Sequence, residues 1–284
     1  ARGILLHRKD ILARPVSTTD IVTHPKQYLS NEKRTLLVSF ARSGNSPESV
    51  AVVDIVNNYC REVFHIIITC NSEGKLYIEG NAGNSLKILL PRETIDASLA
   101  MTSSFTSMML AYVLIARIDT IEEEKEHIDR IARWITHVLE NEQEKIKELA
   151  QLDFERAVFL GSGPLVGIAR ESHLKLQELT DGQVICKFDT FLGFRHGPKA
   201  VINNKTLIVY LLSDESYARQ YEIDLIQQVN LENKGMAQVI ISKNHEDIPD
   251  FHPRLDISYS DSSKSIAIEY IGIAHVVFAQ LLGY

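Results

Sequence analysis

Four residues in the second half of this 284-residue chain have side chains and spacing that could transfer protons. Glu171, Lys175 and Glu178 follow one another at helical intervals, which places them on one stripe of a helix predicted over residues 165–179. His196 lies in a loop punctuated by glycine and proline, where an imidazole is presented rather than buried. A carboxylate can move a proton between adjacent carbons, and a histidine exchanges protons near neutral pH. An exposed ladder of ion pairs is the competing interpretation of the stripe.

The segment from Thr35 to Ser49 carries a pattern typical of an anion site. A buried parallel strand is predicted to run into a loop in which Gly44 lets the backbone approach a ligand. Ser46 is predicted to cap the helix that follows, with Pro47 as its first residue. The unpaired N–H groups of that first turn and the nearby serine hydroxyls would converge on a phosphate. An ordinary capped loop is the alternative interpretation.

Composition narrows the class of protein. The chain is 45% hydrophobic and 24% charged with a net charge of −7, and its basic residues are scattered, so a nucleic-acid partner is not expected. Cys60, Cys70 and Cys186 have no metal-ligand or disulfide spacing, so we expect no metal, no cofactor and a cytoplasmic location. The apolar stretch 99–118 is interrupted by Ser and Thr, which predicts a buried helix rather than a membrane span.

An internal repeat indicates how these segments are positioned. Thr35-Leu-Leu-Val38 recurs as Thr206-Leu-Ile-Val209, and each copy ends in a long apolar helix, predicted over 97–117 and 265–282. Strands that alternate with helices predict an open, mostly parallel sheet covered by helices on both faces. We therefore expect an α/β protein with two tandem, doubly wound domains of the flavodoxin-like three-layer type.

The expected domains cover residues 1–118 and 153–284. Residues 119–152 are rich in Glu, Lys and Gln and have apolar residues at helical spacing, so they are predicted to be amphipathic linker helices. The second copy opens with a strand over 156–160 and the loop Gly161-Ser-Gly163, for which the first copy has no counterpart. The repeat thus predicts that a strand and a glycine loop, about 15 residues upstream, are missing from this sequence.

Together these residues resemble the sugar isomerase (SIS) fold in duplicated form, over nearly the whole chain. Residues 169–178, followed by Arg195-His-Gly-Pro198, look like the isomerase half of glucosamine-6-phosphate synthase. With residues 42–49, 100–104 and 194–199, the pattern is closer to the tagatose-6-phosphate ketose/aldose isomerase group, whose members are also described as galactosamine-6-phosphate deaminase/isomerases. The family's first-domain Gly-Thr-Ser loop is absent, and the chain stops at Tyr284, where relatives continue into a tail.

The resemblance implies a role for each candidate residue. Glu178 would be the base that shuttles a proton between carbons 1 and 2, and His196 the ring-opening acid/base that reaches a neighbouring subunit's site. Glu171 and Lys175 would support the reacting end. The expected phosphate and substrate contacts are Arg42, Ser43, Gly44, Asn45, Ser46, Ser49, Thr102, Ser103 and Arg195. A shared site requires a homodimer or a higher homo-oligomer.

Three functions follow from this pattern. The first is a metal-independent enzyme that converts galactosamine 6-phosphate to tagatose 6-phosphate and ammonia. The second is plain aldose–ketose isomerisation of a sugar phosphate without deamination, which would use the same base and the same ring-opening group. The third is a sugar-phosphate sensor, which needs the phosphate loop but no base.

Overall fold

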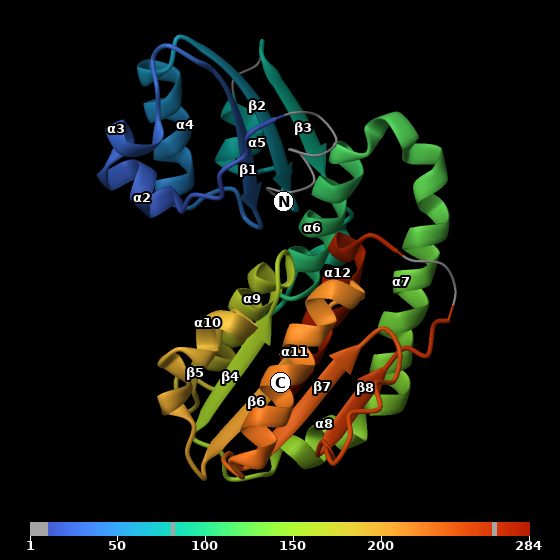
Figure 1. Ribbon diagram of the computed structural model, residues 1–284. Helices are drawn as coiled ribbons and strands as arrows, with labels where there is room; N and C mark the ends of the chain where they lie inside the picture. The colour runs from blue at the N-terminus through green and yellow to red at the C-terminus, as the bar shows by residue number, and fades with distance from the viewer. Residues whose placement is uncertain (1–10, 81–82, 263–265) are drawn as a thin grey trace. The chain divides into compact units, whose positions relative to one another are not determined.

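The computed structural model describes residues 11–80, 83–262 and 266–284 (Figure 1). The chain divides into two compact units, Ala1–Ile118 and Asp119–Tyr284. Both are α/β units with a parallel sheet.

The first unit contains a three-stranded sheet in the order β1-β2-β3. Its strands are β1 (Arg34–Ala41), β2 (Glu62–Thr69) and β3 (Ser85–Leu89). Its helices are α2 (Thr18–Thr23), α3 (Pro25–Tyr28), α4 (Pro47–Tyr59), α5 (Lys75–Glu79), η1 (Arg92–Thr94) and α6 (Ser103–Ala116). Val52 and Val56 of α4 pack with Ile21 and Val63 in one core cluster. On the sheet's other face, Phe40 meets Tyr112 of α6, with ring centroids 5.6 Å apart.

Strand β1 is more exposed than a buried parallel strand should be. Within the described residues it is an edge strand. Leu36 and Phe40 of β1, with Phe64 of β2 and Leu86 of β3, lie on one face and are 42–54% exposed. The expectation of a buried strand is therefore wrong for this face, which α6 covers only in part. The upstream strand predicted from the repeat lies outside the described residues.

The second unit contains a five-stranded parallel sheet in the order β5-β4-β6-β7-β8. Its strands are β4 (Arg156–Gly161), β5 (Ile185–Asp189), β6 (Thr206–Leu211), β7 (Ala237–Ser242) and β8 (Leu255–Ser258). Its helices are α7 (Lys125–His137), η3 (Val138–Glu142), α8 (Gln143–Ala150), α9 (Leu165–Leu179), α10 (Phe191–Arg195), η4 (Pro198–Val201), α11 (Ser216–Leu231) and α12 (Ile268–Gly283); η2 (Ile118–Glu124) begins at the boundary between the units.

Helices cover both faces of the second sheet. Val158 and Leu160 of β4 join the core cluster that contains Phe191 and Phe194 of α10 and residues of α11. Helix α9 packs on the other face and against α12. At the turn from β4 into α9, a Cβ on Gly161 would lie 2.5 Å from the Leu165 carbonyl oxygen, so this approach requires glycine.

The segment expected to link two domains is part of the second unit. Helices α7 and α8 pack against α12. Trp134 stacks on Tyr259 with ring centroids 4.8 Å apart, and its indole N–H donates to Asp261 at 3.1 Å. The amphipathic pattern correctly predicted a buried stripe in this segment, but the stripe serves the core of this unit.

Helix α6 begins at Ser103, six residues later than the predicted start at residue 97. Residues 97–102 instead form a loop, and the Thr102 hydroxyl at its end donates a hydrogen bond to Asp96. Within the described residues no single helix is long and apolar enough to cross a membrane. The helical segments Ser103–Ala116 and Ile118–Ala150 reach that length and apolar composition only when they are counted as one, and the chain bends sharply between them.

Candidate active site

The loop after β1 has the geometry of an anion site. Gly44 has a φ of +67°, Ser46 is the N-cap of α4 and Pro47 is its first residue, as the sequence predicts. The Ser46 hydroxyl donates to the Ser49 hydroxyl at 2.6 Å, and the Asn45 N–H donates to the Ser43 hydroxyl at 3.3 Å. The first N–H groups of a helix have no acceptor within the helix and carry the positive end of its dipole. Serine hydroxyls and helix N–H groups therefore lie together in this loop, which is the pattern that favours an anion.

The loop after β2 supports the phosphate loop, and the sequence analysis missed it. The Asn71 side-chain amide donates to the Ser43 carbonyl at 2.9 Å, and the Leu76 N–H donates to the Gly44 carbonyl at 3.1 Å. A Cβ on Gly74 would lie 2.4 Å from the Ser43 carbonyl oxygen. Gly74 is thus needed for the close approach of the two loops, and a glycine shortly after the apolar run of residues 66–68 is the signal that could have found it.

Thr102 and Ser103 point to a carboxylate of the chain itself. Their hydroxyls donate to Asp96 Oδ1 at 2.8 Å and 2.9 Å, and the Thr102 N–H donates to the same oxygen at 3.1 Å. The Ser104 hydroxyl donates to Asp96 Oδ2. The start of α6 therefore already holds a carboxylate of the chain, and the phosphate contacts expected for Thr102 and Ser103 stay a prediction.

Asp96 also anchors Arg42. The Asp96 side chain is only 2% exposed, and Arg42 Nη1 lies 3.9 Å from its Oδ2. Burial raises the pKa of Asp96, but the hydrogen bonds from Ser104, Thr102 and Ser103 outweigh it and lower the pKa to about 2. Arg42 also donates to the Ser98 and Leu99 carbonyls at 2.8 Å and 3.2 Å. Arg42 therefore ties the loop before α6 to the end of β1.

The Glu171, Lys175 and Glu178 stripe on α9 is a charge cluster around a buried lysine. Lys175 Nζ donates to Glu178 Oε2 at 2.7 Å and lies 3.4 Å from Glu171 Oε1. The lysine side chain is 4% exposed, against 16% for Glu171 and 40% for Glu178. Burial raises the pKa of Glu171, and the charge of Lys175 opposes that rise. An exposed ion-pair ladder is therefore the wrong interpretation of this stripe, because its cation is buried.

The stripe does not lie at the carboxyl end of β4. Glu178 is 15 residues beyond Gly163, which is about 20 Å along a helix at 1.5 Å per residue. The glycine loop at the start of α9 therefore does not bring Glu178 to the carboxyl edge of the sheet. If Glu178 contacts a substrate, the contact lies on the surface around the last turns of α9.

His196 is the C-cap of the short helix α10 and is exposed, as its glycine- and proline-rich surroundings predict. The flanking cations differ from one another. Arg195 is half-buried, and within the described residues its Nε is buried without a hydrogen-bond partner. Lys199 forms an ion pair with Glu232, so its charge is already matched within the chain.

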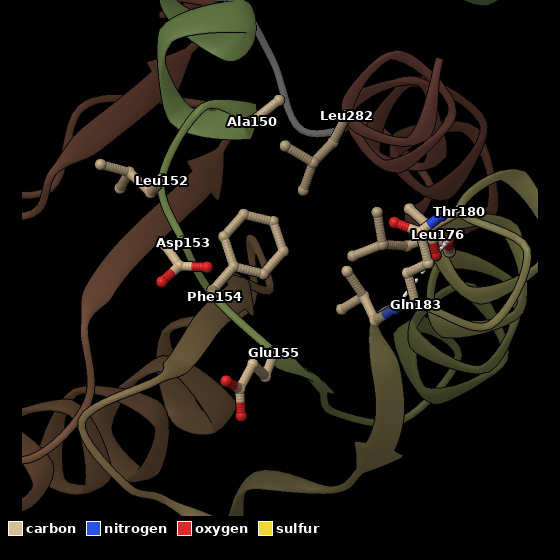
Figure 2. Close-up of a pocket in the computed structure, with 10 residues that line it drawn as sticks. Ala150, Leu152, Asp153, Phe154, Glu155, Leu176, Thr180, Gln183 and Leu282 are labelled. Atoms are coloured by element: carbon tan, nitrogen blue, oxygen red, sulfur yellow. Dashed lines mark hydrogen bonds between the residues drawn. The ribbon is translucent and has the colours of Figure 1, made fainter.

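A hollow of about 320 Å³ lies beside the amino-terminal ends of β4 and β5 (Figure 2). Phe154, Leu176, Thr180 and Leu282 are among its lining residues, and it contains none of the predicted site residues. Its lining includes the carboxylates of Asp153 and Glu155, which would repel a phosphate, so we do not assign the substrate to it.

Two parallel sheets that alternate with helices place this chain in the class of α/β proteins. No protein-family model matches the chain. The chain is 42% identical over 236 residues to D-galactosamine-6-phosphate deaminase AgaS of Escherichia coli O157:H7. The matched residues make up 82% of this chain and 61% of that protein. The chain thus spans about 61% of the length of that curated relative.

Solved structures agree with the sequence comparison. The crystal structure of tagatose-6-phosphate ketose/aldose isomerase from Escherichia coli matches with a TM-score of 0.91 at 36% identity, over 99% of this chain and 75% of that chain. The C-terminal domain of glucosamine-fructose-6-phosphate aminotransferase from Francisella tularensis matches with a TM-score of 0.80 at 16% identity, covers 100% of this chain and 78% of that chain, and shows the fold alone. The chain belongs to the SIS family that contains the AgaS deaminases and the tagatose-6-phosphate ketose/aldose isomerases, which confirms the resemblance found in the sequence.

Proposed function

We propose that this chain is an SIS enzyme that converts galactosamine 6-phosphate and water to tagatose 6-phosphate and ammonia. The observation that carries the proposal is the Glu178 carboxylate held at 2.7 Å by the buried ammonium of Lys175. Burial of the Lys175 ammonium costs free energy unless it is paired, and Glu171 and Glu178 both pair it. Lys175 contacts Oε2 of Glu178, whose side chain is 40% exposed, so this carboxylate is both fixed and open to a substrate. The names of the relatives supply the sugar.

The first unit would bind the phosphate group. Ser43, Asn45, Ser46 and Ser49 supply side-chain groups around the start of α4, and Gly44 shapes the loop. This arrangement needs no metal, because backbone N–H groups and hydroxyls supply the donors. Arg42 would act by holding the neighbouring loop rather than by direct contact.

The second unit would carry out the proton transfers. His196 moves the proton from the C1 hydroxyl to the ring oxygen, which opens the sugar to its aldehyde. Glu178 takes the proton from carbon 2 while oxygen 1 of the aldehyde takes a proton from water, which gives an enolamine, and Glu178 then returns its proton to carbon 1. The imine left at carbon 2 is hydrolysed by water to the ketone and ammonia. Lys175, supported by Glu171, stabilises the negative charge that develops during proton transfer.

The proposal extends to the domains, the location and the assembly of the protein. Each unit would be one SIS domain, and the two would be tandem copies. Arg195, whose Nε lacks a partner within the described residues, would contact the substrate. The protein would act in the cytoplasm as a homodimer or a higher homo-oligomer, in which His196 serves a neighbouring copy.

The test is ammonia release from galactosamine 6-phosphate, with glucosamine 6-phosphate beside it and tagatose 6-phosphate assayed for aldose formation. Ammonia from the galacto sugar alone supports the proposal. Aldose formation from tagatose 6-phosphate without ammonia release would select the plain isomerase. Binding of all three sugars without turnover would make the chain a sensor and overturn the proposal.

The base is tested separately with Glu178→Gln, which keeps the hydrogen bond to Lys175 but cannot accept the proton. We expect kcat to fall by roughly 10³-fold with KM little changed, because general-base catalysis contributes about 10²–10⁴-fold. Glu148→Gln, at an exposed position of α8, is the matched control and should leave kcat unchanged.

A further inference from the structure

His196 depends on its backbone for its position. Its side chain is exposed, and no hydrogen bond to its ring forms within the described part of the chain. A histidine that transfers protons is usually oriented by a third group, as in a catalytic triad. The residues that fix the turn on either side of His196 must therefore do this work.

The turn is anchored on its N-terminal side by packing and a cap. Phe191 and Phe194 of α10 are 1% and 0% exposed and lie in the main core cluster of the second unit. The Gly193 N–H donates to the Thr190 hydroxyl at 2.9 Å, which caps the first turn of α10. This anchor reaches to Phe194, two residues before the imidazole.

On the C-terminal side the anchor is an ion pair. Lys199 Nζ binds Glu232 Oε1, and the two side chains are 16% and 27% exposed. Gln228 Nε2 lies 3.5 Å from the same oxygen, and Lys234 Nζ lies 3.3 Å from the other one. Since Lys199 is three residues after His196, this pair ties the end of the turn to α11.

Glu232 stands where the helix itself disfavours a carboxylate. It is the C-cap of α11, a helix of 16 residues, where the negative end of the helix dipole disfavours a carboxylate. The hydrogen bond from Lys199 lowers the pKa of Glu232, and Lys234 adds to this effect. The carboxylate is thus stabilised mainly through its contact with the His196 turn.

We propose that Glu232 is a positioning residue for His196: through Lys199 it fixes the turn from His196 to Lys199 and so sets the rate of sugar-ring opening. The inference rests on the proposed function, because it assumes that His196 opens the ring. It adds Glu232, at the end of α11, to the residues that support ring opening. Lys199 then serves as the ion-pair partner of Glu232.

The experiment isolates ring opening from the later steps. In a Glu178→Gln background the proposed base is gone, and the α and β anomers of galactosamine 6-phosphate can exchange only by opening and closing the ring. NMR exchange spectroscopy measures this rate above the uncatalysed rate. We expect Glu232→Gln and Lys199→Met each to lower the catalysed exchange about tenfold. The double variant should be no worse than either single variant, because both break one contact.

Controls separate positioning from general damage. Lys234→Met removes the exposed lysine on the same carboxylate and should leave exchange unchanged, whereas Lys199→Arg keeps the ion pair and should restore it. In an otherwise unaltered protein, Glu232→Gln should lower kcat and leave KM within about twofold. Far-UV circular dichroism and the Tm of each variant report folding.

The outcomes distinguish this inference from the proposed function. Unchanged anomer exchange in Glu232→Gln, additive losses in the double variant, or an equal loss in Lys234→Met would each overturn the role of Glu232. If Glu178→Gln still releases ammonia at the normal rate, the proposed base is wrong, while the anomer exchange still tests Glu232. If Glu178→Gln alone catalyses no exchange, His196 does not open the ring and the inference fails with it.

Discussion

Replacing Asp96 with asparagine should loosen the start of α6 by an amount that the structure allows us to work out. The folded-state pKa is about 2, against 3.8 for an unperturbed aspartate. One pKa unit corresponds to about 1.4 kcal/mol, so the ionised carboxylate contributes about 2 kcal/mol to the free energy of unfolding. Asparagine removes the charge and places an amide where Oδ2 accepts from Ser104 and faces Arg42. The variant should lose about this amount or somewhat more.

The stabilisation by Asp96 should decrease as the pH falls. Asp96 has a folded pKa below its unfolded pKa, so its stabilisation is fully present above about pH 4 and is lost as pH falls toward about 2. The difference between the parent protein and Asp96→Asn should therefore stay constant from about pH 7 to 5 and shrink below about pH 4.

Amide hydrogen exchange of peptides from residues 96–116, measured by mass spectrometry, localises the effect. We expect exchange in α6 to be about 30-fold faster in Asp96→Asn at pH 7, which is about 2 kcal/mol converted to an equilibrium constant. Asp54→Asn, at an exposed position of α4, is the control. Equal protection of α6 in the parent protein and in Asp96→Asn would refute the reasoning, as would a difference that persists unchanged at pH 3.

Three further predictions address other parts of the chain. Ser46→Ala should raise KM for the sugar phosphate about tenfold, the loss of one hydrogen bond to a charged group, whereas Ser103→Ala should leave KM nearly unchanged because its hydroxyl serves Asp96; steady-state kinetics compares the two. Gly193→Ala should lower both kcat and Tm, since its Cβ would lie 2.6 Å from the Thr190 hydroxyl that caps α10; an unchanged Tm would contradict this. Burial lowers the pKa of His275 to about 4, so protonation favours the unfolded state, and stability should fall by about 2 kcal/mol from pH 7 to 5; urea titrations of His275→Gln should show a flatter pH dependence over that range.

The sequence could predict the geometry of the loop between β1 and α4 because every signal in it is local. An apolar strand, a glycine with positive φ, a serine cap and a proline at the first helical position follow one another within about a dozen residues. Each feature restricts the backbone by itself, and all agree on one boundary. The same holds for α9, whose bounds at Leu165 and Leu179 match the prediction.

Features that depend on distant contacts could not be predicted in this way. Helical spacing places Lys175 beside two glutamates but does not tell whether that stripe is covered. Its burial has a tertiary cause: α12 runs so close to α9 that a Cβ on Gly283 would lie 2.9 Å from the Leu179 side chain and 3.4 Å from the Lys175 carbonyl oxygen. Asp96 was missed for a related reason, because its partners in α6 lie beyond a loop that sequence analysis assigned to the helix itself.

The two sheets also show that similar strand orders can carry loops of different chemistry. The order β1-β2-β3 of the first unit corresponds to β6-β7-β8 of the second, in agreement with the repeat of Thr35-Leu-Leu-Val38 in Thr206-Leu-Ile-Val209. After β1 lie serines and the first N–H groups of α4, the groups that we propose bind the phosphate. After β6 the corresponding loop places Asp214, which pairs with the buried Lys243 at 2.9 Å. The fold accounts for where the loops lie, and a few side chains at the strand ends decide which of them can receive a ligand.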